Sequence, residues 1–493
     1  MKPITRRSLL ASFAVMPAAL KAQTDEGWIP LFDGKSLTGW TASEHRDSWK
    51  VVDGLLAADG PRSHLFYTGP LRSAAFRNFE LKADVLTRPL CNSGVYFHTK
   101  FQPSGWPQQG FEVQVNNTAM GEGGYLERKK TGSLYGVRNV YKAFALDGKW
   151  FQLRVTVRGK QVQVRLDGML LVDYVEPDPP VPDPDGPGRI LTTGTFALQC
   201  HDAGSKAFFR NILVKPLPDD AAATTAEKPV VDDVYRQIRT LSAHNIPVVD
   251  YHVHLKGGWT LEEALENSRR TGIAYGIAVN CGVGFPVQND AAVQDFLQTM
   301  QGQPVFVAMQ AEGREWVNTF SPETVAKFDY VFTDAMTFSH WGRRVRLWIP
   351  AEVGEIKDPE TFMDVIVDRI VGVLNDEPVD IYVNPTFLPD VMAKDYDRLW
   401  TPARMSCVIE AARRNDKAIE INNRYRIPSA KFIKAAKAAG AKFSFGTNNG
   451  DREIGRLEYP LAMVRECGLE WQDIFVPKPD GEKPIQKRGF KRG

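Results

Sequence analysis

Residues 28–217 alternate between apolar and polar side chains with a period of two. Phe79–Val85 and Phe111–Val115 each place apolar side chains on one face and polar side chains on the other, which predicts half-buried β-strands. Phe151–Val157 and Val162–Leu166 flank a short turn and predict a β-hairpin. Many short strands separated by turn residues, without a clear helical pattern, predict an antiparallel β-sandwich.

From residue 246 onward, short apolar runs alternate with segments of helical period. The seven predicted strands are Pro247–Tyr251, Tyr275–Val279, Val305–Met309, Tyr330–Thr333, Ile381–Val383, Ala418–Ile421 and Phe443–Phe445. The helical segments between them include Leu261–Arg270, Pro359–Leu374, Thr401–Arg414 and Ser429–Ala439. Repeated β-α units predict a parallel barrel or a doubly wound sheet, and barrel enzymes carry their chemistry at the carboxyl ends of the strands.

The change of period divides the chain into regions. The predicted boundaries are a signal peptide at 1–23, a β-sandwich at 24–217, a linker at 218–245, a barrel at 246–476 and a tail at 477–493. The proline-rich stretch Pro177–Pro187 is incompatible with a central strand and predicts an exposed loop. The chain is therefore expected to be a two-domain protein.

The first 23 residues have the pattern of an export signal. A basic start is followed by the apolar stretch Leu9–Leu20, and the pair Arg6-Arg7 is typical of the twin-arginine route, which carries folded proteins. Removing this segment changes the formal net charge from +2 to −2. We expect a periplasmic or secreted protein without a membrane span after signal removal.

Composition narrows the class of protein. Hydrophobic residues make up 43% of the chain and charged residues 24%, which is typical of a soluble globular protein. The near-balanced charge does not favour a nucleic-acid partner, and no motif indicates a nucleotide cofactor. The five cysteines are scattered without a C-x-x-C pair, so a disulfide scaffold or a zinc ribbon is not expected.

Two histidines close the first predicted barrel strand. His252 and His254 are separated by one residue, so both imidazoles project from the same side of that strand. Two imidazoles a few ångströms apart are suitable ligands for one metal ion. The other strand ends also carry polar, ligand-type residues, namely Asn280, Glu312, Asp334, Asn384, Glu420 with Asn422, and Asn448 with Asn449.

These motifs resemble the polymerase and histidinol phosphatase (PHP) superfamily of metal-dependent hydrolases. The resemblance spans residues 246–476 and rests on D-Y-H-V-H-L from Asp250, A-E-G around Glu312, A-I-E-I-N-N around Glu420 and F-S-F-G-T-N-N before Gly450. It implies a seven-stranded (βα) barrel in which His252, His254 and Glu312 are metal ligands.

Several residues of the PHP pattern are replaced. Asn280-Cys281 stands where a histidine is usual, Asn384-Pro385 replaces the usual His-Pro, and Asn448-Asn449-Gly450 replaces a terminal D-x-H. The resemblance therefore implies one divalent ion, zinc, manganese or iron, instead of a multinuclear site. The alternative is a degenerate barrel that binds a polar ligand without metal. The predicted substrate contacts in the barrel are Glu420, Asn422 and Arg424. Arg424 is included because it follows the strand end by two residues and its guanidinium can form forked hydrogen bonds to hydroxyls or anions.

The sandwich region has a separate resemblance. The stretch G-W-I-P-L-F-D-G-K-S-L-T-G-W at residues 27–40, followed by Asn92–Phe97, Phe111–Val115, Leu198–His201 and Phe209–Ile212, resembles the 3-keto-disaccharide hydrolase domain, a concanavalin-like jelly roll. The family implies cleavage of glycosides that are oxidised at C3 of the sugar.

Polar side chains on these strands supply candidate chemistry. Glu112 and Gln114 share one strand face, and so do Gln199 and His201, so they face either solvent or a concave groove. A keto group at C3 acidifies the neighbouring C–H, and Glu112 or His201 is the candidate general base. The predicted substrate contacts are Asn92, Gln114, Gln199 and the aromatic platform Trp106. The paired carboxylates of a common glycosidase are not evident.

Together these features predict an exported hydrolase or lyase whose partner is a carbohydrate or glycoside. The sandwich would cleave a 3-keto-glycoside, and the barrel would carry a second, metal-assisted hydrolytic site. Two alternatives stay open: a PHP-type metallohydrolase, acting on a phosphoester or related substrate, with a carbohydrate-binding sandwich, and a non-enzymatic glycan-binding protein with a degenerate barrel.

Overall fold

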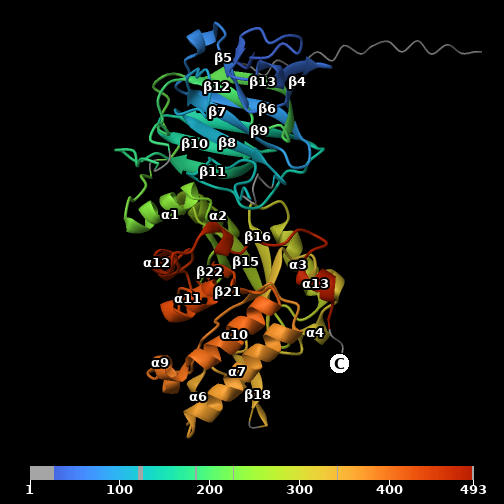
Figure 1. The fold of residues 1–493 in the computed structure, drawn as a ribbon, viewed down its shortest axis with the longest axis vertical. Coiled ribbons are helices and arrows are strands. Elements are labelled where there is room, and N and C mark those ends of the chain that lie inside the picture. The colour runs from blue at the N-terminus through green and yellow to red at the C-terminus, as the bar shows by residue number, and fades with distance from the viewer. Residues whose placement is uncertain (1–26, 120–125, 184–185, 226, 341, 491–493) are drawn as a thin grey trace, which may run out of the picture.

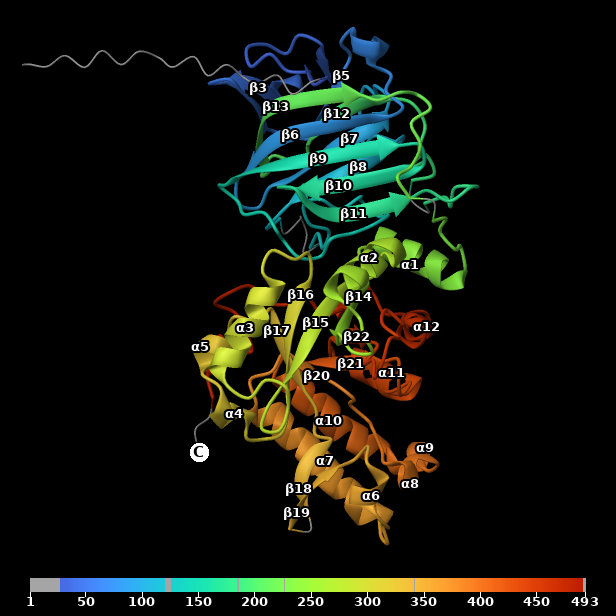
Figure 2. The same ribbon diagram turned by 180° about the vertical axis from the view of Figure 1, so that it is seen from behind.

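The chain folds into two domains stacked end to end, an all-β domain followed by an α/β domain (Figures 1 and 2). The computed structural model describes residues 27–119, 126–183, 186–225, 227–340 and 342–490. The predicted export signal at 1–23 lies outside the described residues. The predicted architecture, a jelly-roll sandwich followed by a seven-stranded (βα) barrel, is confirmed.

The all-β domain consists of two antiparallel sheets. One has the strand order β11-β10-β9-β6-β13-β4-β3 with β1 paired to β13, and the other has the order β2-β5-β12-β7-β8. The strands are β1 Ile29–Pro30, β2 Trp40–Ala42, β3 Trp49–Val52, β4 Leu55–Asp59, β5 Ser63–Tyr67, β6 Phe79–Thr87, β7 Asn92–Thr99, β8 Phe111–Asn116, β9 Trp150–Arg158, β10 Gln161–Leu166, β11 Met169–Val175, β12 Thr195–Cys200 and β13 Lys206–Pro216. Two short 3-10 helices, Arg46–Ser48 and Leu71–Ala74, lie in the connections.

The apolar halves of the alternating strands form the sandwich core. Val155 and Val157 of β9, together with Phe111, Val113 and Val115 of β8, belong to one buried cluster between the sheets. The predicted hairpin is confirmed, because β9 and β10 pair from Arg158 opposite Gln161. Since the apolar face of β8 is used for the core, its polar face points away from the opposite sheet.

The α/β domain is a closed barrel of seven parallel strands in sequence order. The strands are β14 Val249–Val253, β15 Ala274–Cys281, β16 Phe306–Ala311, β17 Tyr330–Thr333, β20 Ile381–Tyr382, β21 Ala418–Asn422 and β22 Phe443–Gly446. The helices are α2 Leu261–Thr271, α3 Asp290–Met300, α4 Trp316–Thr319, α5 Pro322–Val325, α6 Pro350–Val353, α7 Pro359–Asp376, α8 Asp390–Ala393, α9 Tyr396–Leu399, α10 Pro402–Arg414, α11 Ala430–Ala438, α12 Glu458–Cys467, a 3-10 turn Trp471–Asp473 and α13 Pro484–Arg488. All seven predicted barrel strands are present.

Local sequence signals set the helix boundaries. Helix α2 begins with a capping box, in which Thr260 and Glu263 satisfy each other's backbone N–H groups, and it ends at Gly272 in the left-handed conformation. Helix α11 begins after Ser429, whose side chain accepts a hydrogen bond from the N–H of Phe432.

Three segments differ from the sequence expectation. The segment 218–245, expected to be a linker, contains helix α1 (Asp233–Ala243), which begins after the N-cap Asp232. Within the expected exposed loop Pro177–Pro187, Asp183 is buried. After β17, the chain forms the two-stranded hairpin β18 (Thr337–His340) and β19 (Arg343–Arg346) outside the barrel. Neither a single buried side chain such as Asp183 nor a hairpin as short as β18–β19 produces a periodic pattern in the sequence.

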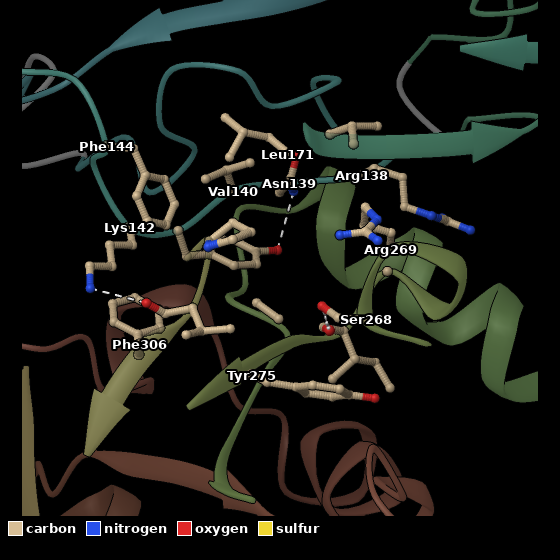
Figure 3. A pocket seen from close by; sticks show the side chains of 17 residues that line it. Arg138, Asn139, Val140, Lys142, Phe144, Leu171, Ser268, Arg269, Tyr275 and Phe306 are labelled. Atoms are coloured by element: carbon tan, nitrogen blue, oxygen red, sulfur yellow. Dashed lines mark hydrogen bonds between the residues drawn. The ribbon is translucent and has the colours of Figure 1, made fainter. Parts of the chain in front are cut away.

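The two domains pack directly against each other (Figure 3). The ring of Tyr141, from the sandwich domain, belongs to the apolar cluster formed by Tyr251, Phe306 and Tyr330 at the barrel. The cavity left at this interface has a volume of about 50 Å³. That space suits a few water molecules and is too small for a substrate. No described helix has the length and apolar character needed to cross a membrane.

Candidate active site

The polar face of the five-stranded sheet forms the floor of a cavity of about 920 Å³. Strands β7 and β8 pair with Tyr96 opposite Glu112 and Gly94 opposite Gln114, so polar side chains from both strands meet on one face. Loops at residues 102–109 and 186–189 supply the walls. All six site residues predicted for the sandwich line this cavity, namely Asn92, Trp106, Glu112, Gln114, Gln199 and His201.

Glu112 is buried at the floor of the cavity with 7% of its surface exposed. Its Oε2 accepts a hydrogen bond from the Tyr96 hydroxyl at 2.8 Å, and its Oε1 accepts one from Gln199 Nε2 at 3.1 Å. Gly94 lies across the strand pair, and a Cβ at that position would be 2.4 Å from Glu112 Oε1. The glycine therefore leaves the space that the carboxylate occupies.

The burial of Glu112 changes its acidity. Removal from water raises the pKa of the Glu112 carboxyl to about 7, against the opposing effects of the Tyr96 hydrogen bond and the Arg189 charge. A carboxyl with a pKa near neutrality is suited to accept and release protons at physiological pH.

Two amide side chains beside Glu112 present buried acceptor atoms. Gln114 donates from Nε2 to Asn92 Oδ1 at 2.8 Å, while Gln199 donates to Tyr96 and to Glu112. Within the described residues, Gln114 Oε1 and Gln199 Oε1 have no hydrogen-bond partner although both are buried. Buried amide oxygens normally accept a hydrogen bond. Because hydroxyl groups are hydrogen-bond donors, this cavity matches a ligand rich in hydroxyl groups.

Trp106 and His201 lie together at the more open side of the cavity. Their rings are 4.8 Å apart between centroids, and Trp106 is 43% exposed. His201 Nδ1 is 2.7 Å from Asp202 Oδ2. When Asp202 accepts the Nδ1 proton, His201 Nε2 is left free to exchange a proton with a ligand. Trp106 provides an apolar face of the type on which sugar rings pack.

Sequence reasoning missed several residues of this cavity, including four with charged or phenolic side chains. Tyr96, Glu127, Tyr135 and Arg189 all line it. Arg189 donates to the buried Asp183 at 2.9 Å, and its guanidinium lies 5.3 Å from the Tyr135 ring centroid. Tyr96 lies within the Asn92–Phe97 motif, and strand alternation puts it on the same face of β7 as the predicted contact Asn92. The other three lie in irregular segments, where no period shows which way a side chain points.

The barrel strand ends converge on a buried polar network. His252 Nδ1 is 2.6 Å from Glu420 Oε1, and Glu420 Oε2 accepts from the backbone N–H of Asn384 and from Asn422 Nδ2. A Cβ at Gly446 would overlap Glu420 Oε1, so the glycine makes room for this pair. Glu420 and Asn422, predicted to contact substrate, are thus engaged in holding His252 and each other.

The predicted metal ligands have separate partners. The rings of His252 and His254 are 5.4 Å apart, and His254 Nδ1 is 3.0 Å from the Ala278 carbonyl oxygen. Glu312 Oε1 accepts a hydrogen bond from Asn280 Nδ2 at 2.7 Å. Burial, and then the nearby Asp334 carboxylate, raises the pKa of Glu312 to about 7.

The donor set does not fit a metal ion as it stands. Across the part of the chain that the structure describes, no group of three or more His, Cys, Asp or Glu side chains is arranged to hold one. His252 Nε2 is buried and has no hydrogen-bond partner among those residues. The divalent metal therefore stays a prediction.

Arg424 is separated from Glu420 and Asn422. Its side chain lies at the rim of the barrel, over the Tyr425 ring at 5.3 Å, and lines a cavity of about 710 Å³ with Trp348 and Tyr459. Its Nη1 is 3.5 Å from the Asn448 carbonyl oxygen. The structure thus does not bring the three predicted barrel contacts to one surface.

Comparison with known proteins gives a family match that covers the sandwich domain. Residues 27–215 match the family described as the 3-keto-alpha-glucoside-1,2-lyase-like domain. A candidate glycosyl hydrolase from Parabacteroides distasonis ATCC 8503 is 25% identical, with 39% of this chain and 95% of that chain covered and a TM-score of 0.33. The carbohydrate binding module CBM66 from Bacillus subtilis is 16% identical, with 36% and 95% covered and a TM-score of 0.26. No curated protein matches the chain.

Proposed function

We propose that the protein is a carbohydrate-active enzyme whose sandwich cavity cleaves 3-keto-glycosides. The match of residues 27–215 to the 3-keto-alpha-glucoside-1,2-lyase-like domain supports this substrate class. A cavity of about 920 Å³ also has a volume typical of sites for small-molecule ligands.

The observation that carries the proposal is the surroundings of Glu112. A buried carboxylate is held by Tyr96 and Gln199, and the unpartnered amide oxygens of Gln114 and Gln199 lie around it within the described residues. A sugar supplies the hydroxyl donors that these oxygens lack. The carboxylate is then placed among groups that orient a carbohydrate.

The proposed reaction begins with proton transfer. The C3 keto group acidifies the C2–H bond, and the Glu112 carboxylate accepts the C2 proton. The electron pair of the broken C–H bond forms a double bond between C1 and C2 as the bond from C1 to the leaving oxygen breaks. We assign to His201, whose Nδ1 contacts Asp202, the transfer of a proton from Nε2 to that leaving oxygen. Addition of water to the double bond would complete a net hydrolysis.

Release of the leaving group from a 3-keto-glucoside tests the proposal. We expect the wild-type protein to release it, and Glu112→Gln to lower kcat by about 100-fold or more, because a general base contributes on this order. Glu355→Gln is the matched control, since Glu355 is exposed and lies in the barrel domain.

Two outcomes would decide against the proposal. Full turnover by Glu112→Gln would remove Glu112 as the base. Sugar binding by the wild-type protein without turnover would favour the alternative, a glycan-binding protein.

The predicted metal-dependent hydrolytic site of the barrel is kept apart from this proposal. The closed seven-stranded barrel has two neighbouring histidines at the end of β14, but its described donor set does not fit a metal ion as it stands. His252, His254 and Glu312 lie in the barrel and do not line the sandwich cavity, so the reaction proposed above does not involve them.

A further inference from the structure

One segment of the sandwich domain lies between the candidate active site and the barrel domain. This interface segment, residues 126–142, belongs to the connection between β8 and β9. Its Glu127 and Tyr135 line the cavity, while its Tyr141 belongs to the apolar cluster of the barrel. The same short stretch of chain therefore contacts both the site and the second domain.

The interface segment is hydrogen-bonded along the strand that carries Glu112. The backbone N–H of Tyr135 donates to the Glu112 carbonyl oxygen at 2.9 Å. The N–H of Gln114 donates to the Ser133 carbonyl oxygen at 2.9 Å, and the N–H of Gly132 donates back to the Gln114 carbonyl oxygen at 2.9 Å. A shift of the segment would therefore disturb the strand that presents Glu112 and Gln114.

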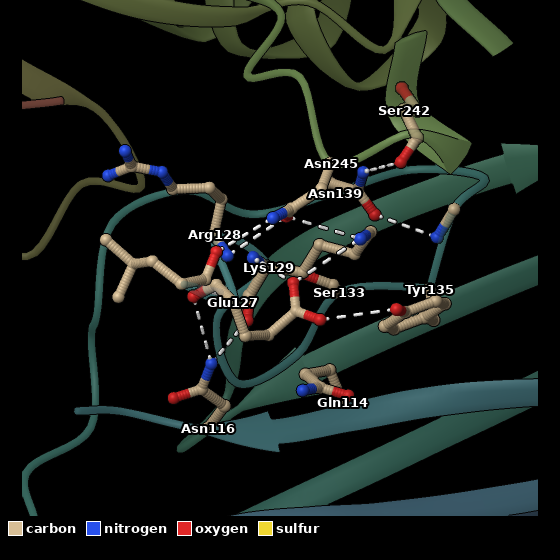
Figure 4. A network of polar contacts seen from close by, with 12 residues as sticks. Gln114, Asn116, Glu127, Arg128, Lys129, Ser133, Tyr135, Asn139, Ser242 and Asn245 are labelled. Atoms are coloured by element: carbon tan, nitrogen blue, oxygen red, sulfur yellow. Dashed lines mark hydrogen bonds and ion pairs between the residues drawn. The ribbon is translucent and has the colours of Figure 1, made fainter. Parts of the chain in front are cut away.

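A buried ion pair lies near the start of the segment (Figure 4). Lys129 Nζ is 3.3 Å from Glu127 Oε1, and the two side chains are 0% and 3% exposed. Glu127 Oε2 accepts a hydrogen bond from the Tyr135 hydroxyl at 3.2 Å, and Lys129 Nζ lies 4.2 Å from the Tyr135 ring centroid. A buried pair of charges is stable only while its hydrogen bonds and geometry are maintained.

Asn245 holds this ion pair from outside the sandwich domain. It lies between α1 and β14, and its side chain reaches the interface segment (Figure 4). Asn245 Nδ2 donates to the Leu126 carbonyl oxygen at 2.8 Å, and Asn245 Oδ1 accepts from the Arg128 N–H at 3.0 Å and from Lys129 Nζ at 3.4 Å. Its φ of 61° is a conformation that asparagine and glycine tolerate better than other residues.

Other contacts attach the interface segment to the barrel side. Asn139 Nδ2 donates to the Ser242 carbonyl oxygen at 3.0 Å, and Arg239 Nη1 donates to the Gly136 carbonyl oxygen at 2.9 Å. Lys142 Nζ is 2.6 Å from Asp329 Oδ2. The segment is therefore anchored at several points, and the contacts of Asn245 with Leu126, Arg128 and Lys129 are the ones that flank the cavity residue Glu127.

We propose that Asn245 is a positioning residue for the sandwich cavity. Through its side chain, the segment that leads into the barrel holds the Glu127–Lys129 pair and the wall of the active site in place. This inference rests on the proposed function and assigns the second domain a part in it: the sandwich site is complete only when the barrel is docked. Asn245 acts through Glu127, Lys129 and Tyr135 and does not itself line the cavity.

The variant Asn245→Gly tests the inference in the full-length protein. Glycine accepts the left-handed conformation, so this change removes the amide without straining the backbone. We expect KM for a 3-keto-glucoside to rise about tenfold, consistent with the loss of a buried hydrogen-bonding group, and kcat to change little. Asn245→Asp keeps the acceptor oxygen and is expected to restore most of the wild-type KM.

A second measurement separates this inference from the proposed function. Backbone amide exchange across residues 126–135 is expected to become faster in Asn245→Gly and to stay at the wild-type rate in Asn211→Gly. Asn211 is the matched control because it also has a positive φ, of 49°, and is exposed on β13. If the wild-type protein lacks turnover, the proposed function fails, and amide exchange still reports on the contact.

Three outcomes would overturn the inference. Unchanged amide exchange in Asn245→Gly would show that Asn245 does not hold the segment. Faster exchange with an unchanged KM would show that the segment does not position the cavity. An Asn211→Gly variant that changes KM as much as Asn245→Gly would reduce the effect to a general loss of stability.

Discussion

At the scale of single residues, Glu112 differs from an ordinary strand glutamate in what surrounds it. Its carboxylate occupies the space that Gly94 leaves open, accepts hydrogen bonds from Tyr96 and Gln199, and is withdrawn from water. The strand alternation predicted correctly that Glu112 and Gln114 share a face. It did not predict that this face is buried, because the covering loops have no regular pattern. The same limit applies to Arg189, whose partner Asp183 lies in a proline-rich stretch that reads as an exposed loop.

The raised pKa of Glu112 predicts the pH dependence of the reaction. A base acts in its deprotonated form, so a pKa of about 7 means that kcat/KM increases with pH up to about 7 and then levels. Below that value, we expect kcat/KM to fall about tenfold per pH unit, because one group is being protonated. A pH series with the 3-keto-glucoside measures this limb. If the midpoint of this fall in kcat/KM is near pH 4.5, the ordinary range of a glutamate, the assignment is contradicted. The residual activity of Glu112→Gln should not show this fall in kcat/KM below pH 7.

At the scale of elements, the regular parts were predictable and the connections were not. Period-two alternation identified β6, β8, β9 and β10 because each has one face in the core. The barrel strands were identified as short apolar runs between helices. Helix α1 was missed because the proline-rich and acidic residues before it indicated a linker. The interface segment gave no signal, since its order comes from the ion pair of Glu127 and Lys129 and from partners distant in sequence.

The buried ion pair makes a testable contribution to the stability of this segment. Lys129→Met is expected to lower the free energy of unfolding by about 3 kcal/mol, because it leaves the Glu127 carboxylate buried without its counter-ion. Urea denaturation of the full-length protein measures the change. The control is Lys434→Met, because Lys434 and Glu466 form an exposed pair at 3.8 Å, whose loss should cost less than about 1 kcal/mol. Equal losses in the two variants would contradict the role given to the buried pair.

At the scale of the whole molecule, the predicted metal-ligand motif and the open cavity lie in different domains. The barrel contains the predicted metal-ligand motif, but its strand-end side chains are largely hydrogen-bonded to each other. Examples are the pairs of His252 with Glu420 and of Asn280 with Glu312. The sandwich has the open cavity and the buried carboxylate of Glu112. Sequence reasoning identified part of the residues in each place. It could not determine which side chains are free to meet a ligand, because that depends on partners far apart in the chain.

The central claim is that Glu112 removes the C2 proton of a 3-keto-glycoside in the sandwich cavity. The most direct test is turnover of a 3-keto-glucoside that carries deuterium at C2. The account predicts that the wild-type protein turns over this substrate several times more slowly than the unlabelled one, and that the product has lost the C2 label. Equal rates for the two substrates, with deuterium retained at C2 of the product, would mean that the glycosidic bond breaks without C2 deprotonation and would contradict the account.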